Sequence, residues 1–295
     1  MSDSIVGHRP TTDEMAAARV LLEPWRLLTS PLFYGVERVP TDRPFLLVGN
    51  HTLMGVLDIP LMLLGLHERS GVIVRSLGDH VHFQVPLWRD LLVRFGTVDG
   101  TRENCERLMR AGESILVFPG GAREVFKHKG EQYHLIWKNR TGFAALAIAH
   151  GYPIVPFAAV GAEECYDILV DSDEMRHSPL GPVLEWLTPR ADELPPVVAG
   201  IGPLPRPQRF YFRFEAPVET QRWAGRADNQ TACLEVRAEV ARAIERGIKI
   251  LQRARRRDPE ATLAARLMRR LAGQTSARRA PLQRAGNRRR RNRRG

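Results

Sequence analysis

Short apolar runs alternate along the chain with longer segments in which apolar residues recur every three or four positions. The apolar runs predict buried strands at residues 45–48, 72–74, 114–118, 153–160 and 210–214. The periodic segments predict helices at residues 12–30, 86–95, 103–110, 141–149 and about 229–256. Because strands alternate with helices, the pattern favours an α/β fold in which helices flank a central mixed, largely parallel sheet. Pro156 within the fourth run predicts an edge strand or a bulge there.

The N-terminal helix is amphipathic and begins with a capping-box pattern, Thr11 to Glu14. Its apolar residues fit a helix that packs on the core. The alternative is an interfacial helix with Trp25 at a membrane surface. Near the other end of the chain, five apolar residues of the long helix are expected to face inward: Leu234, Val240, Ile244, Ile248 and Leu251.

The composition changes twice along the chain. Acids and prolines dominate residues 163–208, which predicts an irregular insertion, one interpretation of which is a mobile cover over a site. Sixteen arginines and two acids give residues 251–295 a charge of +14, so residues 1–250 carry −3 of the total of +11. We therefore expect one domain over residues 1–250 and a basic tail, helical and then disordered, over residues 251–295.

Other features of composition bear on the environment of the protein. The three cysteines are far apart, without pairing or metal spacing, which indicates a reducing compartment. We expect no signal peptide, because the N-terminus is polar, and no membrane-spanning helix, because no run of 18 apolar residues occurs. The arginine run at residues 288–294 lacks the interleaved aromatics of single-strand binders, so nucleic acid is not expected as a partner.

The first candidate for chemistry follows the strand at residues 45–48, where Gly49 leads into Asn50 and His51. Ligands of open α/β sheets bind just outside the carboxyl ends of strands. A histidine there can act as a general base near neutral pH, and Asp58 could orient it. The alternative is a buried histidine that is hydrogen-bonded to backbone.

The second candidate follows the strand at residues 114–118. Gly120 and Gly121 allow backbone amides to approach a bound group closely, and Arg123 adds a cation suited to phosphate or carboxylate. The alternative is an ordinary turn with a surface arginine.

Four motifs in order, across roughly residues 40–162, resemble the glycerolipid (lysophospholipid) acyltransferase superfamily, and within it most resemble the diacylglycerol acyltransferase type 2 and phytyl ester synthase branch. They are Asn50-His51 with Asp58, the segment at 96–102 that ends in Arg102, the segment FPGGAR at 118–123, and YPIVP at 152–156. The second has the family's glycine-to-arginine spacing, and the last two are similar to its F-P-E-G-T-R and V-P-I-V-P blocks.

The resemblance implies the acyltransferase fold and transfer of an acyl group from acyl-CoA, as co-substrate, to a hydroxyl of a glycerolipid or other lipid alcohol. It implies His51 as base and Asp58 as its orienter. It also implies substrate contacts from Asn50, Arg102, Gly120, Gly121 and Arg123. No cofactor or metal is implied. The alternatives are a lysophosphatidic acid or lysophospholipid acyltransferase with a phosphorylated acceptor, and a non-catalytic lipid-binding protein of the membrane surface.

Two departures from the family pattern affect these expectations. Six residues separate His51 from Asp58 instead of four, and on a regular helix they would lie about 10 Å apart along the axis. An orienting role for Asp58 therefore predicts that the chain loops out near Gly55 before the helix begins. Gly120 replaces the glutamate of the third motif, with Glu124 after the arginine, which favours a neutral acceptor over a phosphorylated one.

The C-terminal tail suggests how such a chain reaches a lipid. From Pro259 to Leu271 the pattern predicts a helix with Leu263, Leu267 and Leu271 on one face and Arg266, Arg269 and Arg270 off it. With the arginines that follow, this helix predicts peripheral attachment to an anionic membrane surface, on the cytoplasmic face.

Overall fold

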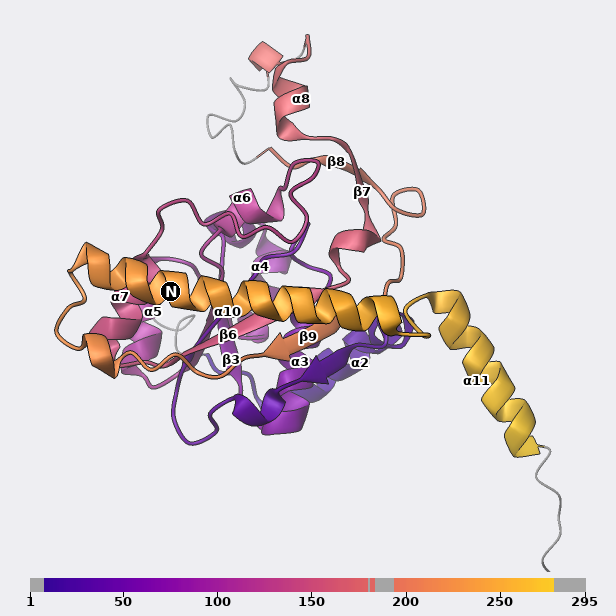
Figure 1. The fold of residues 1–295 in the computed structure, drawn as a ribbon, viewed down its shortest axis with the longest axis horizontal. Helices are drawn as coiled ribbons and strands as arrows, with labels where there is room; N and C mark the ends of the chain where they lie inside the picture. Colours follow the sequence, from indigo (N-terminus) through magenta and orange to yellow (C-terminus); the bar gives the residue numbers. More distant parts are fainter. Residues whose placement is uncertain (1–7, 180, 184–193, 279–295) are drawn as a thin grey trace, which may run out of the picture.

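Apolar residues alternate between the two sides of the central strand. Phe45 and Leu47 face one side of strand β2 (Leu46–Gly49), whereas Leu46 and Val48 face the other, and all four are fully buried. A strand buried on both faces needs a helical layer on each side. The computed structural model, which describes residues 8–179, 181–183 and 194–278, shows these two layers (Figure 1).

The strands of the structure are β1 (Leu32–Tyr34), β2, β3 (Val74–Gly78), β4 (Thr97–Asp99), β5 (Ser114–Val117), β6 (Ile154–Val160), β7 (Asp167–Val170), β8 (Val197–Ala199) and β9 (Tyr211–Phe214). The α-helices are α2 (Thr12–Thr29), α3 (Ile59–Ser70), α4 (Pro86–Arg94), α5 (Arg102–Arg110), α6 (Gly121–Val125), α7 (Gly142–His150), α8 (Ser172–Arg176), α10 (Gln230–Arg257) and α11 (Leu263–Arg278). Short 3₁₀ helices are η1 (Val36–Arg38), η2 (His80–Gln84), η3 (Glu163–Cys165) and η5 (Gln221–Trp223).

Seven strands form the main sheet, in the order β1-β9-β6-β2-β5-β3-β4. The five strands from β6 to β4 are parallel to one another, and β9 joins β6 in the antiparallel sense. The mixed, largely parallel sheet predicted from the sequence is therefore confirmed. The carboxyl ends of the five parallel strands lie along one edge of the sheet.

Two helical layers cover this sheet. Apolar residues of α2 and α3 pack with one face, and those of α5, α7 and α10 pack with the other. Helix α10 lies across the sheet along β6 (Figure 1). A Cβ atom at Gly247 of α10 would lie 2.8 Å from the Cβ of Ala158, so this glycine allows the helix to approach β6 closely.

Two expectations about individual residues of the core need correction. Leu234 of α10 is 39% exposed, and Val236 instead faces the core with the other four residues expected there. Pro156 does not mark an edge, because β6 lies between β9 and β2. The other expectation, a bulge, is confirmed, because the pairing shifts by one residue between Phe157↔Phe214 and Ile154↔Val218. The Pro156 carbonyl accepts from the N–H of Glu215, one residue past the end of β9.

The segment at residues 163–208 is more regular than expected. It contains η3 and α8, and β7 pairs with β8 in a small antiparallel sheet. Lys129, in the loop after α6, forms an ion pair of 2.6 Å with Glu174 of α8. His128 in the same loop contacts Asp173 and Ser172, so the segment is fastened to the loop that follows β5 and α6.

Helix α2 begins with the capping box of Thr11 and Glu14. The side chain of Trp25 packs against the body of the protein and is not placed to anchor the helix in a membrane surface. Its indole N–H donates to the carbonyl of Leu57 at 2.8 Å, and its ring meets Phe210 edge-on. The outward face of α2 is nevertheless apolar, and its exposed residues include Val20, Leu21, Leu27 and Leu28.

Helix α11 extends away from the sheet and its helices (Figure 1). Leu267, Met268 and Leu271 are exposed, as an apolar face requires. Arg266 is only 3% exposed and donates to the carbonyls of Leu28 and Pro207. This arginine attaches α11 to the end of α2. No helix within the described ranges is long and apolar enough to span a membrane.

We expect Arg266→Ala to release α11 without disturbing the sheet, because it removes charge-assisted bonds worth about 1.5–3 kcal/mol each. Hydrogen exchange in peptides from residues 263–278 should accelerate at least about tenfold, while exchange in β2 and β6 stays unchanged. The matched control is Arg269→Ala, since Arg269 is an exposed arginine of α11 that pairs with Glu260, which precedes the helix. Equal exchange in both variants would contradict the role of Arg266 as the attachment point.

Candidate active site

His51 lies directly after the central strand β2, at the carboxyl edge of the parallel strands. Its ring stacks on Phe118, the residue after β5, with ring centroids 3.9 Å apart. Nδ1 is buried and has no hydrogen-bond partner among the described residues. The other side of the ring meets Gly55, where a Cβ atom would lie 2.5 Å from Cε1. The imidazole is therefore held by van der Waals contacts, with Phe118 on one side and the loop at Gly55 on the other.

The chain loops out between His51 and Asp58, as an orienting role for Asp58 predicted. Met54 and Gly55 both adopt positive φ, of 63° and 62°, and α3 begins only at Ile59. The loop does not join the two side chains, however. Asp58 accepts from the hydroxyl of Thr52 at 2.8 Å, and within the described part of the chain no hydrogen bond links it to His51. Asp58 is thus a buried neighbour of the site rather than a bonded partner of the imidazole.

Asn50 forms part of the sheet. Its side-chain N–H donates to the carbonyl of Ala159 at 3.0 Å, and its side-chain oxygen accepts from the N–H of the same residue at 2.8 Å. This amide continues the β2–β6 ladder by one step after the backbone turns away. Both polar groups of the Asn50 side chain bond to Ala159, so the amide fixes the backbone that leads into His51.

The cations expected to bind substrate have carboxylate partners in the chain itself. Arg123, 12% exposed, forms a forked pair with Glu131, with bonds of 2.7 and 2.9 Å. Arg102 is exposed at the start of α5 and pairs with Glu106. Because β4 is three strands from β2 in the sheet, Arg102 lies roughly 14 Å along the edge from His51. Both terminal nitrogens of Arg123 are engaged by Glu131, so phosphate binding there requires the pair to open, whereas Arg102 pairs through Nε and its terminal nitrogens are exposed.

The glycine turn after β5 is also braced from within. The N–H of Gly121 donates to the carbonyl of Phe118 at 3.1 Å. Arg140, which the sequence analysis did not single out, donates to the carbonyls of Pro119 and Gly120 at 3.0 and 2.7 Å. The turn is consequently a fixed feature of the edge beside His51.

A buried charge cluster, which comprises Asp58, Glu124, Lys127 and Glu163, lies beneath this edge. Lys127 is 0% exposed, and its ammonium group donates to the carbonyl of His51 at 2.5 Å and to Glu163 at 2.7 Å. Glu124 is also 0% exposed and accepts from the indole N–H of Trp137. The sequence analysis missed Lys127 and Glu163, and it noted Glu124 only as a departure. When a lysine or a glutamate lies in a polar loop, nothing in the sequence indicates that its side chain is buried.

Burial shifts the titration of these groups. It lowers the pKa of His51 to about 3, with a smaller effect from the nearby Lys127 charge, so the imidazole is neutral at neutral pH. Burial raises the pKa of Asp58 to about 6, although the Thr52 bond opposes it, and raises the pKa of Glu124 to about 7. The pKa of Glu163 is also raised by burial, against the attraction of Lys127. The site thus combines an uncharged base with three carboxyls around one cation.

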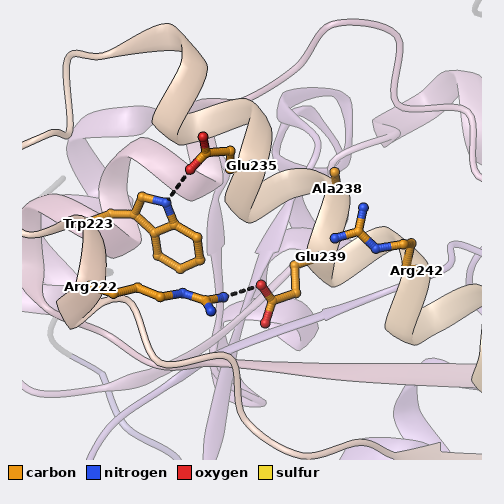
Figure 2. Close-up of a pocket in the computed structure, with 6 residues that line it drawn as sticks. All are labelled: Arg222, Trp223, Glu235, Ala238, Glu239 and Arg242. Atoms are coloured by element: carbon orange, nitrogen blue, oxygen red, sulfur yellow. Dashed lines mark hydrogen bonds and ion pairs between the residues drawn. The ribbon is translucent and has the colours of Figure 1, made fainter.

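A surface pocket of about 400 Å³ lies elsewhere, between η5 and the first half of α10 (Figure 2). Val218, which precedes η5, bridges to Ile154 at the amino end of β6, so this pocket is at the opposite edge of the sheet from His51. Its lining side chains bond to one another: Arg222 donates to Glu239, and the Trp223 indole donates to Glu235. We do not assign substrate binding to it.

Comparison with known proteins places residues 31–160 in the family model Acyltransferase. Phytyl ester synthase 1, chloroplastic, of Arabidopsis thaliana is 29% identical over 254 residues, which are 79% of this chain and 36% of that protein. The human DGAT1/2-independent enzyme synthesizing storage lipids is 32% identical over 123 residues, 42% of this chain and 37% of that protein. The chain spans a little over a third of the length of these relatives.

Among solved structures, the 1-acyl-sn-glycerophosphate acyltransferase PlsC from Thermotoga maritima matches with a TM-score of 0.46 and 17% identity, over 80% of this chain and 83% of that one. The site residues His51, Asp58, Gly120 and Arg123 all lie inside the region that the family model matches.

We expect the His51 ring to remain neutral down to about pH 5, because burial beside Lys127 disfavours the imidazolium. Ring carbon and nitrogen NMR signals, assigned by their loss in His51→Ala, should show no protonation step between about pH 8 and about pH 5. A midpoint near the ordinary histidine value would show instead that the ring is solvated.

Proposed function

Residues 31–160 carry an acyltransferase domain, and from this premise we propose that the chain transfers an acyl group from acyl-CoA to a hydroxyl of a glycerolipid or other lipid alcohol. The observation that carries the proposal is His51, a neutral imidazole at the carboxyl end of the central parallel strand, within the matched region. Two relatives, named as a phytyl ester synthase and an enzyme synthesizing storage lipids, support a lipid alcohol as acceptor.

His51 acts as general base in this proposal. Since Nδ1 is buried, Nε2 meets the acceptor hydroxyl and takes its proton as the oxygen attacks the thioester carbonyl. Backbone amides near Gly120 stabilise the oxyanion. Collapse of the intermediate forms the ester and expels the CoA thiolate, which takes the proton back from the imidazolium. Asp58 then acts through its charge, because its bond is to Thr52.

A neutral acceptor fits the site better than a phosphorylated one. Arg123 is already paired with Glu131, and Arg140 is already bonded to the glycine turn. The buried charge cluster adds three carboxyls and one lysine, so the field below His51 does not attract a phosphate. The cation at Arg102 is exposed at the rim, where we propose that it meets phosphates of the acyl-CoA.

The first test measures acyl transfer by the purified protein from radiolabelled acyl-CoA to separate panels of neutral and phosphorylated lipid acceptors. We expect transfer to the neutral panel, and a loss of about 10²–10⁴ in kcat for His51→Ala with the fold intact. Asp58→Asn should lose less than about tenfold, since it does not bond to the imidazole. The control is His134→Ala, which changes an exposed histidine.

Three results of this test would contradict parts of the proposal. Activity of His51→Ala near that of the wild type would remove His51 as base, and a loss in Asp58→Asn as large as that in His51→Ala would restore Asp58 as its orienter. Transfer to the phosphorylated panel alone would move the assignment to a lysophospholipid acyltransferase.

Access to a lipid acceptor is explained by a membrane-facing surface, defined here as the exposed residues Val20, Leu21, Leu27 and Leu28 of α2 and Leu267, Met268 and Leu271 of α11. The bond from Arg266 to the carbonyl of Leu28 joins the two helices. Burial of this surface contributes about 25 cal/mol per Å² of apolar area. The arginines of residues 279–295 attract anionic headgroups, at about 1 kcal/mol each near the membrane. We propose peripheral attachment of this kind at the cytoplasmic face.

We expect Leu267→Glu with Leu271→Glu to weaken binding to phosphatidylglycerol-containing vesicles at least about tenfold, because charge replaces buried apolar area. Deletion of residues 279–295 should remove most of the salt dependence of binding. The matched control is Leu234→Glu, which changes an exposed leucine of α10. Vesicle flotation compares the variants, and unchanged binding of the double variant would exclude α11 from the membrane contact.

A further inference from the structure

The buried side of the His51 ring is placed by packing. Its Nδ1 atom has no hydrogen-bond partner among the described residues, and the ring meets Phe118 and the loop at Gly55 through van der Waals contacts. Such contacts limit the rotation of the ring but do not fix the point from which the side chain starts. The direction of Nε2 therefore depends on where the backbone of His51 lies.

Side-chain hydrogen bonds fix the backbone on both sides of His51. Before it, the Asn50 amide bonds twice to Ala159 of β6, at 3.0 and 2.8 Å. After it, the ammonium group of Lys127 donates to the carbonyl of His51 at 2.5 Å. The paired residues of β2 end at Gly49, so His51 lies beyond the backbone ladder and these two side chains continue its restraint.

Lys127 belongs to the segment that follows β5 and α6, and this segment packs onto the loop that carries His51. Phe118 stacks on the imidazole, and the carbonyl of Val125 accepts from the N–H of Met54 at 3.2 Å. Of these contacts, the one from Lys127 is made to the backbone of His51 itself. The position of the candidate base is thereby tied to a side chain 76 positions further along the chain.

Glu163, which follows β6, holds Lys127 in turn. Their ion pair measures 2.7 Å, and the two side chains are 0% and 1% exposed. Replacement of a buried ion pair by apolar residues of similar volume is often neutral or stabilising, so stability of the fold alone does not account for this pair. The carbonyl of His51 gives the ammonium group a second acceptor, at the point where the base leaves the sheet.

We propose that Lys127 is a positioning residue for His51, and that Glu163 is the counterion that holds the Lys127 ammonium group against the His51 carbonyl. The ammonium group bonds to the backbone of the base, so it acts through His51 and not on the substrate. The inference rests on the proposed function, because it assigns to Lys127 the placement of the base of that reaction.

The experiment separates the placement of His51 from the stability of the buried pair. The variants are Lys127→Met, Glu163→Gln and the double variant Lys127→Met with Glu163→Leu, in which apolar side chains replace both charges. The matched control is Lys129→Met, because Lys129 lies in the same loop and forms an exposed ion pair of 2.6 Å with Glu174. For each we measure kcat, KM for acyl-CoA, the melting temperature, and the NMR signals of the His51 ring and carbonyl carbon.

We expect Lys127→Met to lower the melting temperature by about 10 °C, because it leaves Glu163 as a buried carboxylate without its counterion. It should also lower kcat by about 100-fold with little change in KM, since a base displaced by about 1 Å loses that much. The double variant should recover most of the melting temperature while kcat stays low, because it removes both charges of the pair but cannot donate to the carbonyl.

The other two variants should keep their activity. Glu163→Gln should stay within about tenfold of the wild type in kcat, because its amide oxygen still accepts from the Lys127 ammonium group. Lys129→Met should leave both kcat and the melting temperature near those of the wild type, since exposed ion pairs contribute little to stability.

Three results would overturn the inference: wild-type kcat in the double variant, a loss of about 100-fold in Glu163→Gln, or the same loss in Lys129→Met. The first would mean that Lys127 stabilises the fold without placing His51. If Lys127→Met does not fold, Glu163→Gln is compared with the double variant instead.

The NMR signals separate this inference from the proposed function. Loss of the charged donor should move the carbonyl carbon signal of His51 upfield and shift its ring signals in the double variant, but not in Lys129→Met. If the wild type transfers no acyl group, these shifts still support the inference, and unshifted His51 signals refute it.

Discussion

The candidate site depends on the contacts that the ammonium group of Lys127 makes. A fully buried cation costs several kcal/mol in lost hydration, and here the carbonyl of His51 and the carboxylate of Glu163 offset that cost. Removal of one partner from such a pair typically destabilises a fold by about 3–5 kcal/mol. The same bond that compensates the lysine also fixes the backbone of His51. Stability and the placement of the base therefore rest on one group.

The topology explains why these groups meet. Strands β2, β5 and β6 are neighbours in the parallel block, so the residues after their carboxyl ends share one edge. Asp58 follows β2, Glu124 and Lys127 follow β5, and Glu163 follows β6. Each strand thus contributes to the buried charge cluster through the loop or helix that comes next. The side chain of Asn50 extends the β2–β6 ladder to the point where His51 leaves the sheet.

The pattern of apolar residues was sufficient to predict the layers, because burial on both faces of β2 and on one face of α10 is visible in the spacing of residues. The location of His51 followed from the strand that precedes it, and the loop before α3 followed from the spacing to Asp58. The partners of the buried charges could not be predicted in the same way. Lys127 contacts residues 76 positions before and 36 positions after it, and such pairs leave no periodic signal. The burial of Arg266 was not predicted for the same reason, since its acceptor on Leu28 is 238 positions away.

Charge is distributed unevenly between the surroundings of His51 and the C-terminal tail. Near His51 the described arginines are engaged: Arg123 by Glu131, and Arg140 by carbonyls of the glycine turn. The lysine of the cluster is matched by Glu163 and has two further carboxyls around it. Anion attraction is concentrated instead in residues 251–295, which carry +14 against −3 for the rest of the chain. The neutral acceptor proposed above, lying in an anionic bilayer, would suit both halves of this arrangement: the basic tail would attract the membrane surface, and the site would receive an uncharged hydroxyl. A phosphorylated acceptor would need the Arg123–Glu131 pair to open first, and the free energy of that pair would be subtracted from its binding.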